Sequence, residues 1–484
     1  MGVKMPRFSK YFSLGLTQHQ LDFVDVSNDY DTPVYVDPYA IEVRDDVWAA
    51  QASEYIRVFF KEVLEALRAN ELDHATGLMS HLHEPEETFL GVSKNDPKGR
   101  GVGPVQAGQL IRAIRASEAY RSGLLSDLSE MALYVEGIDR DKISDLTTNV
   151  IRALLVEYTK QQCDLHGIAT KPYSGPPLWN IVRKDWVSQS VELPFIRKHA
   201  VLLVPKYIVR RRLSLDSQEF YNKQITDFLV AENLRANSSL VKTIKSKSKK
   251  VSQKKVYKKD VREKYPKSKP FITEMVLAHP QILDLYKEVA AKFGAITTFE
   301  DSGPTISAVC GSLATMYANT PKGKKDADKY HQLVLGSLTA LFYPSLIQPR
   351  KEWEIHGGRK RIDIVFTNAA DTGFFAHRRD DHSTFANTVI VECKNYSTDI
   401  ANAEIDQLLG RFDNNRGKFG IITCRSIDKK KLLDERCRNA ASRSQGYVIV
   451  LTDDDIVAML EKKANLEDMK IEEVLHRKYQ DLLA

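Results

Sequence analysis

The chain has 484 residues, with 70 Lys and Arg against 64 Asp and Glu, which gives a formal net charge of +6. A hydrophobic content of 43% and an aromatic content of 9% are typical of a folded protein and exclude a disordered or fibrous chain. The longest apolar runs, 200–205 and 447–451, are far shorter than the ~20 residues of a membrane helix, so we expect no membrane association. The five cysteines form no CxxC pair, which favours free thiols in the cytoplasm.

Residues 1–240 predict a mixed α/β region in which helices dominate. Helical apolar spacing covers 47–69, 104–117 and 141–162, while 23–38 alternates like short strands around turn residues. This part resembles no family known to us, and we expect it to sense a signal or to assemble the protein.

The positive charge gathers in residues 241–270, a Lys- and Ser-rich segment that predicts a linker. Between Lys242 and Lys269 it holds twelve Lys and one Arg against two acidic residues, so the rest of the chain is slightly acidic. The segment is either a solvated tether or a contact to a phosphate backbone, and the two roles are compatible. The lysines that we name for nucleic-acid contact are Lys249, Lys250, Lys254, Lys255, Lys258 and Lys259.

A small helical connector is predicted over 271–325, a compact α/β domain over 326–463 and a C-terminal helix over 464–484. The domain opens with a helix and two strands, which are joined by Gly357 and Gly358. If these glycines form a two-residue hairpin turn, Glu352 lies opposite Asp363 and Glu354 opposite Arg361. A long loop, a third strand over 388–395, a helix, a strand, a second helix and a fifth strand follow.

One group of residues in this domain predicts chemistry. Glu392 and Lys394 are two positions apart in the third strand, so both side chains project from one face while Cys393 points the other way. Asp363, on the neighbouring strand, can bring a second carboxylate to that face. Two carboxylates suit Mg²⁺ or Mn²⁺, and an ammonium beside the metal can orient a water or stabilise a transition state. The group therefore predicts metal-assisted phosphodiester hydrolysis. The alternative is an ordinary α/β domain with surface charges.

Residues 326–455 resemble the PD-(D/E)XK nuclease superfamily. Asp363 matches the first Asp of the pattern and Glu392-Cys393-Lys394 matches its second half, although Ile362 stands where the pattern has Pro. Gln407 resembles the Gln of modified-DNA restriction enzymes and Holliday-junction resolvases. The resemblance implies a restriction-endonuclease-like αβββαβ fold.

The resemblance also implies roles for these residues. Asp363, Glu392 and the backbone carbonyl of Cys393 would hold Mg²⁺ or Mn²⁺, and Lys394 and Gln407 would arrange the attacking water. Glu354 is a further candidate ligand, although pairing with a nearby arginine such as Arg361 is favoured. Two arginines of the loop 368–387 could contact phosphate or be solvated, namely Arg378 and Arg379.

The expected activity is that of a metal-dependent endonuclease with DNA as the favoured substrate. By analogy with effectors that carry long unrelated N-terminal regions, we expect a bacterial restriction or anti-phage role, regulated by residues 1–240. Cutting both strands favours a homodimer or larger assembly. The alternatives are a nucleic-acid-binding module that does not cleave and a nuclease directed at RNA.

Overall fold

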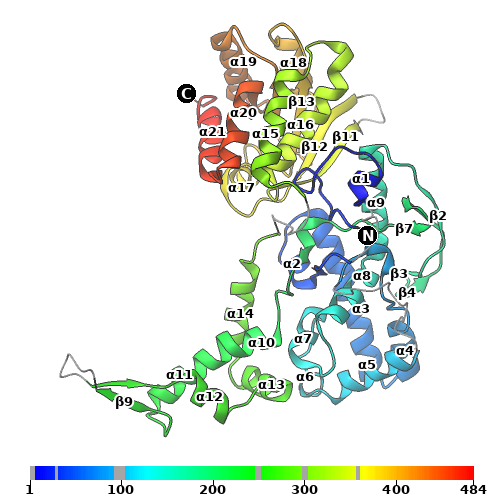
Figure 1. The fold of residues 1–484 in the computed structure, drawn as a ribbon, viewed down its shortest axis with the longest axis vertical. Coiled ribbons are helices and arrows are strands. Elements are labelled where there is room, and N and C mark those ends of the chain that lie inside the picture. The colour runs from blue at the N-terminus through cyan, green and yellow to red at the C-terminus, as the bar shows by residue number, and fades with distance from the viewer. Residues whose placement is uncertain are drawn as a thin grey trace, which may run out of the picture. The chain divides into compact units, whose positions relative to one another are not determined.

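The computed structural model describes residues 6–27, 31–91, 104–245, 252–296, 303–355 and 360–483 (Figure 1). Its internal contacts divide the chain into two compact units. The sheet unit comprises Met1–Ser27, Thr159–Thr170 and Ile296–Ala484, and the helical unit comprises Asn28–Tyr158 and Lys171–Ala295.

The sheet unit is built on a five-stranded mixed sheet. β11, β12 and β13 pair antiparallel, and β13, β14 and β15 pair parallel in the same spatial order. Every residue of β14 is buried and so are six of the seven in β13, as expected for strands covered on both faces. The strands are β11 (Leu346–Ile355), β12 (Lys360–Asn368), β13 (Thr388–Lys394), β14 (Phe419–Cys424) and β15 (Tyr447–Thr452).

Helices connect and cover these strands. Parallel neighbours require crossovers, which are provided by α18 (Asn402–Leu409) between β13 and β14 and by α19 (Lys430–Ser442) between β14 and β15. α16 (Ala327–Phe342) is buried from Leu333 to its end and packs against β11, β12 and β13. α15 (Ile306–Asn319) and α20 (Asp453–Ala464) contact α16 and each other (Figure 1).

The predicted mixed α/β class is confirmed, and the predicted register of the first two strands agrees with the structure. Glu354 pairs with Arg361 and Trp353 with Ile362, which puts Glu352 level with Asp363. The glycine turn itself lies outside the described residues.

The stretch predicted as a long loop contains a short helix, α17 (Gly373–Asp380). Phe374 and Phe375 are buried there, and the ring of Phe374 lies 6.0 Å from that of Tyr479. Tyr479 belongs to α21 (Asp468–Gln480), so the helix predicted within 464–484 is present and packs into the core of the sheet unit.

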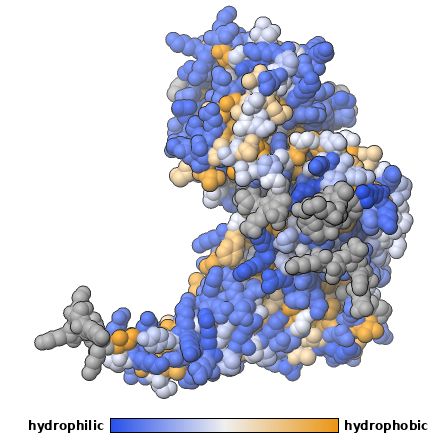
Figure 2. Space-filling view, viewed as in Figure 1, coloured by the Kyte–Doolittle hydropathy of each residue, from blue (hydrophilic) through white to orange (hydrophobic). Residues whose placement is uncertain are grey.

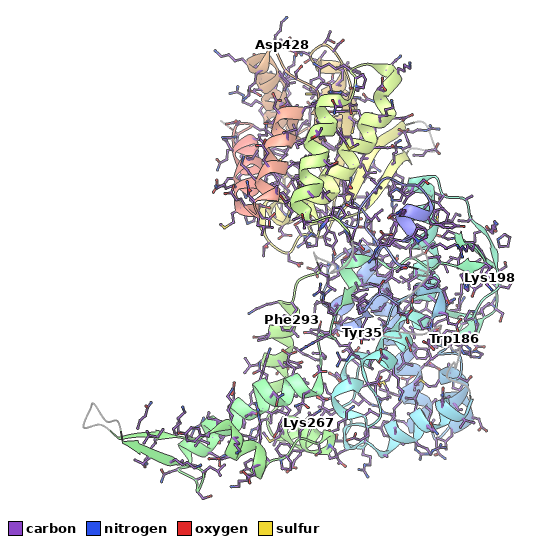
Figure 3. All side chains as sticks on the ribbon, viewed as in Figure 1. Tyr35, Trp186, Lys198, Lys267, Phe293 and Asp428 are labelled. Atoms are coloured by element: carbon purple, nitrogen blue, oxygen red, sulfur yellow. The ribbon has the colours of Figure 1, made fainter. Side chains whose placement is uncertain are left out.

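The helical unit has many helices and small two-stranded sheets, in agreement with the prediction for 1–240. Phe59 of α3 (Val47–Arg68) packs edge-on against Trp179 and Trp186, and Figure 3 marks Trp186. Its other main helices are α4 (Leu72–Met79), α5 (Pro104–Ala116), α8 (Arg140–Val150), α9 (Arg152–His166, which enters the sheet unit at Thr159), α11 (Thr226–Arg235), α13 (Lys269–Ala278) and α14 (Gln281–Ala291).

The domain boundaries differ from those predicted in three places. Residues 1–27 and 159–170 belong to the sheet unit, and the expected connector 271–325 is divided between the units. The expected linker 241–270 holds an antiparallel hairpin, β9 (Lys242–Lys245) with β10 (Ser252–Lys255), and the helix α12 (Lys258–Lys264). The composition of this segment is typical of a linker. Composition alone does not reveal stabilising contacts such as the ion pair between Lys242 and Asp260 at 2.5 Å.

All five cysteines are buried free thiols. Within the described ranges, every helix is too short or too polar to span a membrane.

Candidate metal and catalytic site

The predicted residues meet where β12 and β13 part. The last ladder pair between these strands is Ile364 with Val391. One position beyond, the Oδ2 of Asp363 accepts a hydrogen bond from the backbone N–H of Cys393 at 2.8 Å. A carboxylate thus replaces a ladder bond, which fixes Asp363 at the end of the paired region beside Glu392.

Glu392 and Lys394 project from the same face of β13, as their spacing predicts. The Nζ of Lys394 lies 3.3 Å from Oε2 of Glu392 and donates a hydrogen bond to Oε1 of Gln407 at 3.0 Å. Glu392 is fully buried and Lys394 is 6% exposed. A charge removed from water in this way is costly unless it is paired, so the ammonium and the carboxylate depend on each other.

Two further residues contact this group, and the sequence pattern does not single them out. Arg411 forms an ion pair with Glu392, and its side chain is 6% exposed. Burial lowers the pKa of Arg411, while the nearby carboxylates of Asp363 and Glu352 act in the opposite direction. Spacing is the sequence feature that could have indicated Arg411. It follows Gln407 by four positions, a distance that places side chains on one side of a helix, although Arg411 lies just after the end of α18.

His331 of α16 is the second residue. Its Nε2 lies 3.3 Å from the carbonyl oxygen of Cys393 and 4.0 Å from Oδ2 of Asp363. Its Nδ1 is buried and has no hydrogen-bond partner in the part of the chain that the structure describes. No sequence pattern indicates this histidine, because only the packing of α16 on the sheet brings it to β13.

The donors around Cys393 fit a metal ion in their chemistry. His331, Asp363 and Cys393 each offer a ligand atom, and these atoms lie within 4.8 Å of one another, the one such group among the described residues. Burial raises the pKa of the Cys393 thiol, and Asp363 adds to the effect, so the sulfur is a protonated and poor ligand. The carbonyl oxygen of Cys393, the imidazole and the carboxylate of Asp363 are better donors, while Glu392 is not part of this group and is paired with Lys394 and Arg411.

The other candidates have partners within the protein. Glu354 forms an ion pair with Arg361 at 3.1 Å, with both side chains more than half exposed, which is the structural role that the sequence favours. Arg378 lies 3.8 Å from the ring centre of Tyr479 and pairs with Asp381 at 3.2 Å, and Arg379 pairs with Asp380 at 3.1 Å. The structure therefore does not present Arg378 as a free phosphate contact.

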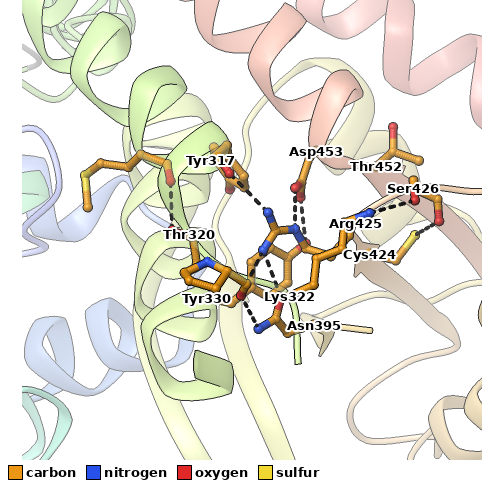
Figure 4. Close-up of polar contacts among 12 residues, drawn as sticks. Tyr317, Thr320, Lys322, Tyr330, Asn395, Cys424, Arg425, Ser426, Thr452 and Asp453 are labelled. Carbon is orange, nitrogen blue, oxygen red and sulfur yellow. Dashed lines mark hydrogen bonds and ion pairs between the residues drawn. The ribbon is translucent and has the colours of Figure 1, made fainter. Parts of the chain in front are cut away.

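A buried polar network holds the end of β13 in place (Figure 4). The amide of Asn395, next to Lys394, donates to the carbonyl oxygens of Pro321 and Gly323 at 3.0 and 2.9 Å. Arg425 donates to Asn395 at 2.9 Å and to Asp453 at 2.6 Å. These bonds tie the segment before α16 to the carboxyl ends of β13, β14 and β15, so His331 and Lys394 sit on connected, rigid elements.

The lysines of the basic segment lie in the helical unit. Lys254 donates to Asn237 at 2.7 Å, Lys258 forms an ion pair with Asp227, and Lys255 lies over the ring of Tyr257. Lys259 is exposed on α12, and Lys249 and Lys250 lie outside the described residues. The visible face of α11 and α12 is mainly hydrophilic (Figure 2).

Residues 13–216 match a family model that is described as "Domain of unknown function (DUF8370)". The match begins in the sheet unit and covers much of the helical unit, and it ends before β11. No curated protein and no solved structure matches the chain. The candidate site therefore has to be interpreted from its own chemistry.

Proposed function

We propose that the sheet unit is a metal-dependent endonuclease with a restriction-endonuclease-like core, and that DNA is its favoured substrate. The observation that carries the proposal is the placement of Lys394, whose ammonium is held between Glu392 and Gln407 beside Asp363. A buried ammonium shared by a carboxylate and an amide, next to a second carboxylate, is costly for a purely structural domain. The order α16, β11, β12, β13, α18, β14 supports the same proposal.

The side chains divide into two roles. Asp363, Glu392 and the carbonyl oxygen of Cys393 would hold Mg²⁺ or Mn²⁺. His331, which lies near Asp363 and the Cys393 carbonyl, would be a further nitrogen donor. The bound ion would supply positive charge that polarises the phosphate and lowers the pKa of water. Lys394 and Gln407 would position the attacking water, because an ammonium and a carboxamide can both hydrogen-bond to its oxygen.

The hairpin β9–β10 and α12 would hold the nucleic acid by its phosphates. This binding is electrostatic, independent of sequence and sensitive to salt. The biological role that we propose is bacterial restriction or anti-phage defence in the cytoplasm, with the helical unit as regulator and a homodimer as the cleaving form.

Cleavage assays test the proposal directly. The purified full-length protein is incubated with double-stranded DNA, single-stranded DNA and RNA in the presence of Mg²⁺ or Mn²⁺. We expect the wild type and the control Arg443→Ala, an exposed position on the same unit, to cleave DNA, and Asp363→Ala and Lys394→Ala to lose that activity. Equal cleavage by all four proteins would refute the site assignment, and preferential cleavage of RNA would change the substrate.

One observation favours the alternative of a binding module that does not cleave. Both oxygens of Glu392 have cationic neighbours, Arg411 and Lys394, so the carboxylate is satisfied without a metal. Titration with Mn²⁺ distinguishes the two functions. If the protein binds nucleic acid but binds no Mn²⁺ when the nucleic acid is present, it is a binding module that does not cleave.

A further inference from the structure

Arg411 is paired with one carboxylate and lies within electrostatic reach of two others. It forms an ion pair with Glu392 of β13 and interacts electrostatically with Asp363 of β12 and Glu352 of β11. The Arg411 side chain is 6% exposed and the Glu392 side chain is fully buried. Glu352 has a positive φ of 51° within β11, so the strand is locally distorted beside the group. A cationic side chain therefore lies where a metal bound to Glu392 would need space.

The charges of this group are not balanced when the metal is bound alone. Within the poorly solvated part of the group, Asp363 and Glu392 provide two negative charges and Lys394 and Arg411 provide two positive ones, while Glu352 is exposed. Addition of a divalent cation would leave two positive charges in excess, and a phosphodiester brings one negative charge that reduces this excess. In a poorly solvated site such an excess is costly, so metal and phosphate together are favoured over metal alone.

We infer that Arg411 couples metal occupancy to the arrival of a nucleic-acid phosphate. In the resting state its guanidinium neutralises Glu392 and competes with the metal for this carboxylate. When a phosphodiester enters, the guanidinium has a second anion to bind, since its planar fork matches phosphate as well as carboxylate. Glu392 is then released to the metal. This inference rests on the proposed function and makes Arg411 a further catalytic residue that contacts the scissile phosphate.

The position of Arg411 allows this exchange. It follows Gly410, the residue that caps α18, and so lies at the start of the turn rather than within the helix. Its backbone carbonyl accepts a hydrogen bond from Arg416 at 3.1 Å, which holds the main chain while the side chain changes partner.

Calorimetric titration of Mn²⁺ into the full-length protein tests the inference. The proteins are the wild type, Arg411→Gln, Arg411→Lys and the control Arg443→Ala, each with and without a short phosphorothioate duplex that resists cleavage. Without the duplex, we expect Arg411→Gln to bind Mn²⁺ at least about tenfold more tightly than the wild type, because one competing charge is gone. The duplex should tighten Mn²⁺ binding to the wild type by about tenfold or more and to Arg411→Gln by much less. Arg411→Lys should lie between the wild type and Arg411→Gln, because it keeps the charge but lacks the planar fork that matches phosphate.

Thermal unfolding gives a second measurement. Arg411→Gln leaves the buried carboxylate of Glu392 with one cationic neighbour, Lys394, instead of two, so we expect Mn²⁺ to raise its melting temperature more than that of the wild type. If Arg411→Gln does not fold, Arg411→Lys still tests the coupling, because its looser grip should weaken the dependence on the duplex.

The outcomes separate the inference from the proposed function. Mn²⁺ binding that is the same or weaker in Arg411→Gln, with cleavage intact in the wild type, would refute the role of Arg411 and leave the nuclease proposal standing. No Mn²⁺ binding to the wild type even with the duplex would refute the nuclease proposal itself.

Discussion

Oδ2 of Asp363 accepts the backbone N–H of Cys393 at 2.8 Å, where the ladder between β12 and β13 has ended. This carboxylate therefore has a structural bond in addition to the metal role that we propose. The two roles can be separated, because a carboxamide keeps an oxygen acceptor but carries no charge.

We expect the free energy of unfolding of Asp363→Asn to lie within about 1 kcal/mol of the wild-type value. That of Asp363→Ala should be lower by about 1–3 kcal/mol, because a buried N–H loses its partner. Both variants should lose cleavage by about a hundredfold or more, since each removes an anionic metal ligand. Urea unfolding and metal-dependent cleavage measure the two effects. Retained activity in Asp363→Asn would show that the charge of Asp363 is not needed.

The hydrogen bond between Lys394 and Gln407 predicts coupling. We expect Lys394→Met to lower the cleavage rate by about 10²–10³-fold, as for loss of a preorganised donor, and Gln407→Ala to lower it by less. Because Gln407 acts through Lys394 and the water, the double variant should be no slower than Lys394→Met. The cycle should therefore show an interaction free energy of about 0.5–3 kcal/mol. Purely additive effects would mean that the two residues act independently.

The β13 part of the site could be predicted from the sequence, but its surroundings could not. Alternation in the strand put Glu392 and Lys394 on one face, and turn geometry put Glu352 level with Asp363, because both rules are local. His331 comes from α16, whose long apolar face predicts only a buried helix. The partner of its Nε2 depends on how α16 packs, which sequence spacing does not encode.

The basic segment shows the same limit. Its lysines and serines favour a solvated tether, yet residues 242–245 and 252–255 pair as strands and residues 258–264 form a helix, with ties to Asp227, Asn237 and Asp260. Asp227 and Asn237 precede the segment in the sequence, and Asp260 is one of two acidic residues within it, so the composition of the segment does not reveal these contacts. Tertiary contacts therefore override the local preference.

The imidazole of His331 leads us to expect that the site prefers Mn²⁺ to Mg²⁺. Imidazole nitrogen suits Mn²⁺ better than Mg²⁺, which prefers oxygen ligands. We expect His331→Ala to weaken Mn²⁺ binding by about 10–100-fold, as for loss of a ligand or of the residue that orients one, and to weaken Mg²⁺ binding less. Calorimetry with each metal measures both constants. An equal loss for the two metals would assign His331 a structural role only.

The basic hairpin predicts a specific salt dependence. Lys254 is bound to Asn237 and Lys258 is paired with Asp227, while Lys255 lies over the ring of Tyr257 and Lys259 is exposed on α12. We expect Lys255→Ala with Lys259→Ala to lower DNA affinity and to reduce the slope of log K against log salt by about 0.9 for each phosphate that is no longer neutralised. Fluorescence anisotropy over a range of salt concentrations measures the slope. The matched control is Lys254→Ala with Lys258→Ala, which should change the slope less, and an unchanged slope in the first pair would make the segment a spacer.

A last prediction concerns Asp145 in α8 of the helical unit. Its pKa is raised to about 8, chiefly by burial and further by the nearby carboxylates of Glu84, Asp141, Asp139 and Asp31. The folded state therefore holds a proton that the unfolded state releases near the ordinary pKa of 3.8. Stability should fall as the pH rises from that value to about 8, because the folded state binds more protons throughout this range.

Asp145→Asn removes this titration with little change in shape. At neutral pH, we expect it to stabilise the protein by about 1 kcal/mol or more, since a neutral side chain no longer has to take up a proton on folding. Below the ordinary pKa of 3.8, where the unfolded carboxyl is also protonated, the two proteins should have the same melting temperature. Melting temperatures of both proteins across this pH range check the difference. A gain that does not depend on pH would show that the amide improves packing and that Asp145 is ionised in the folded state.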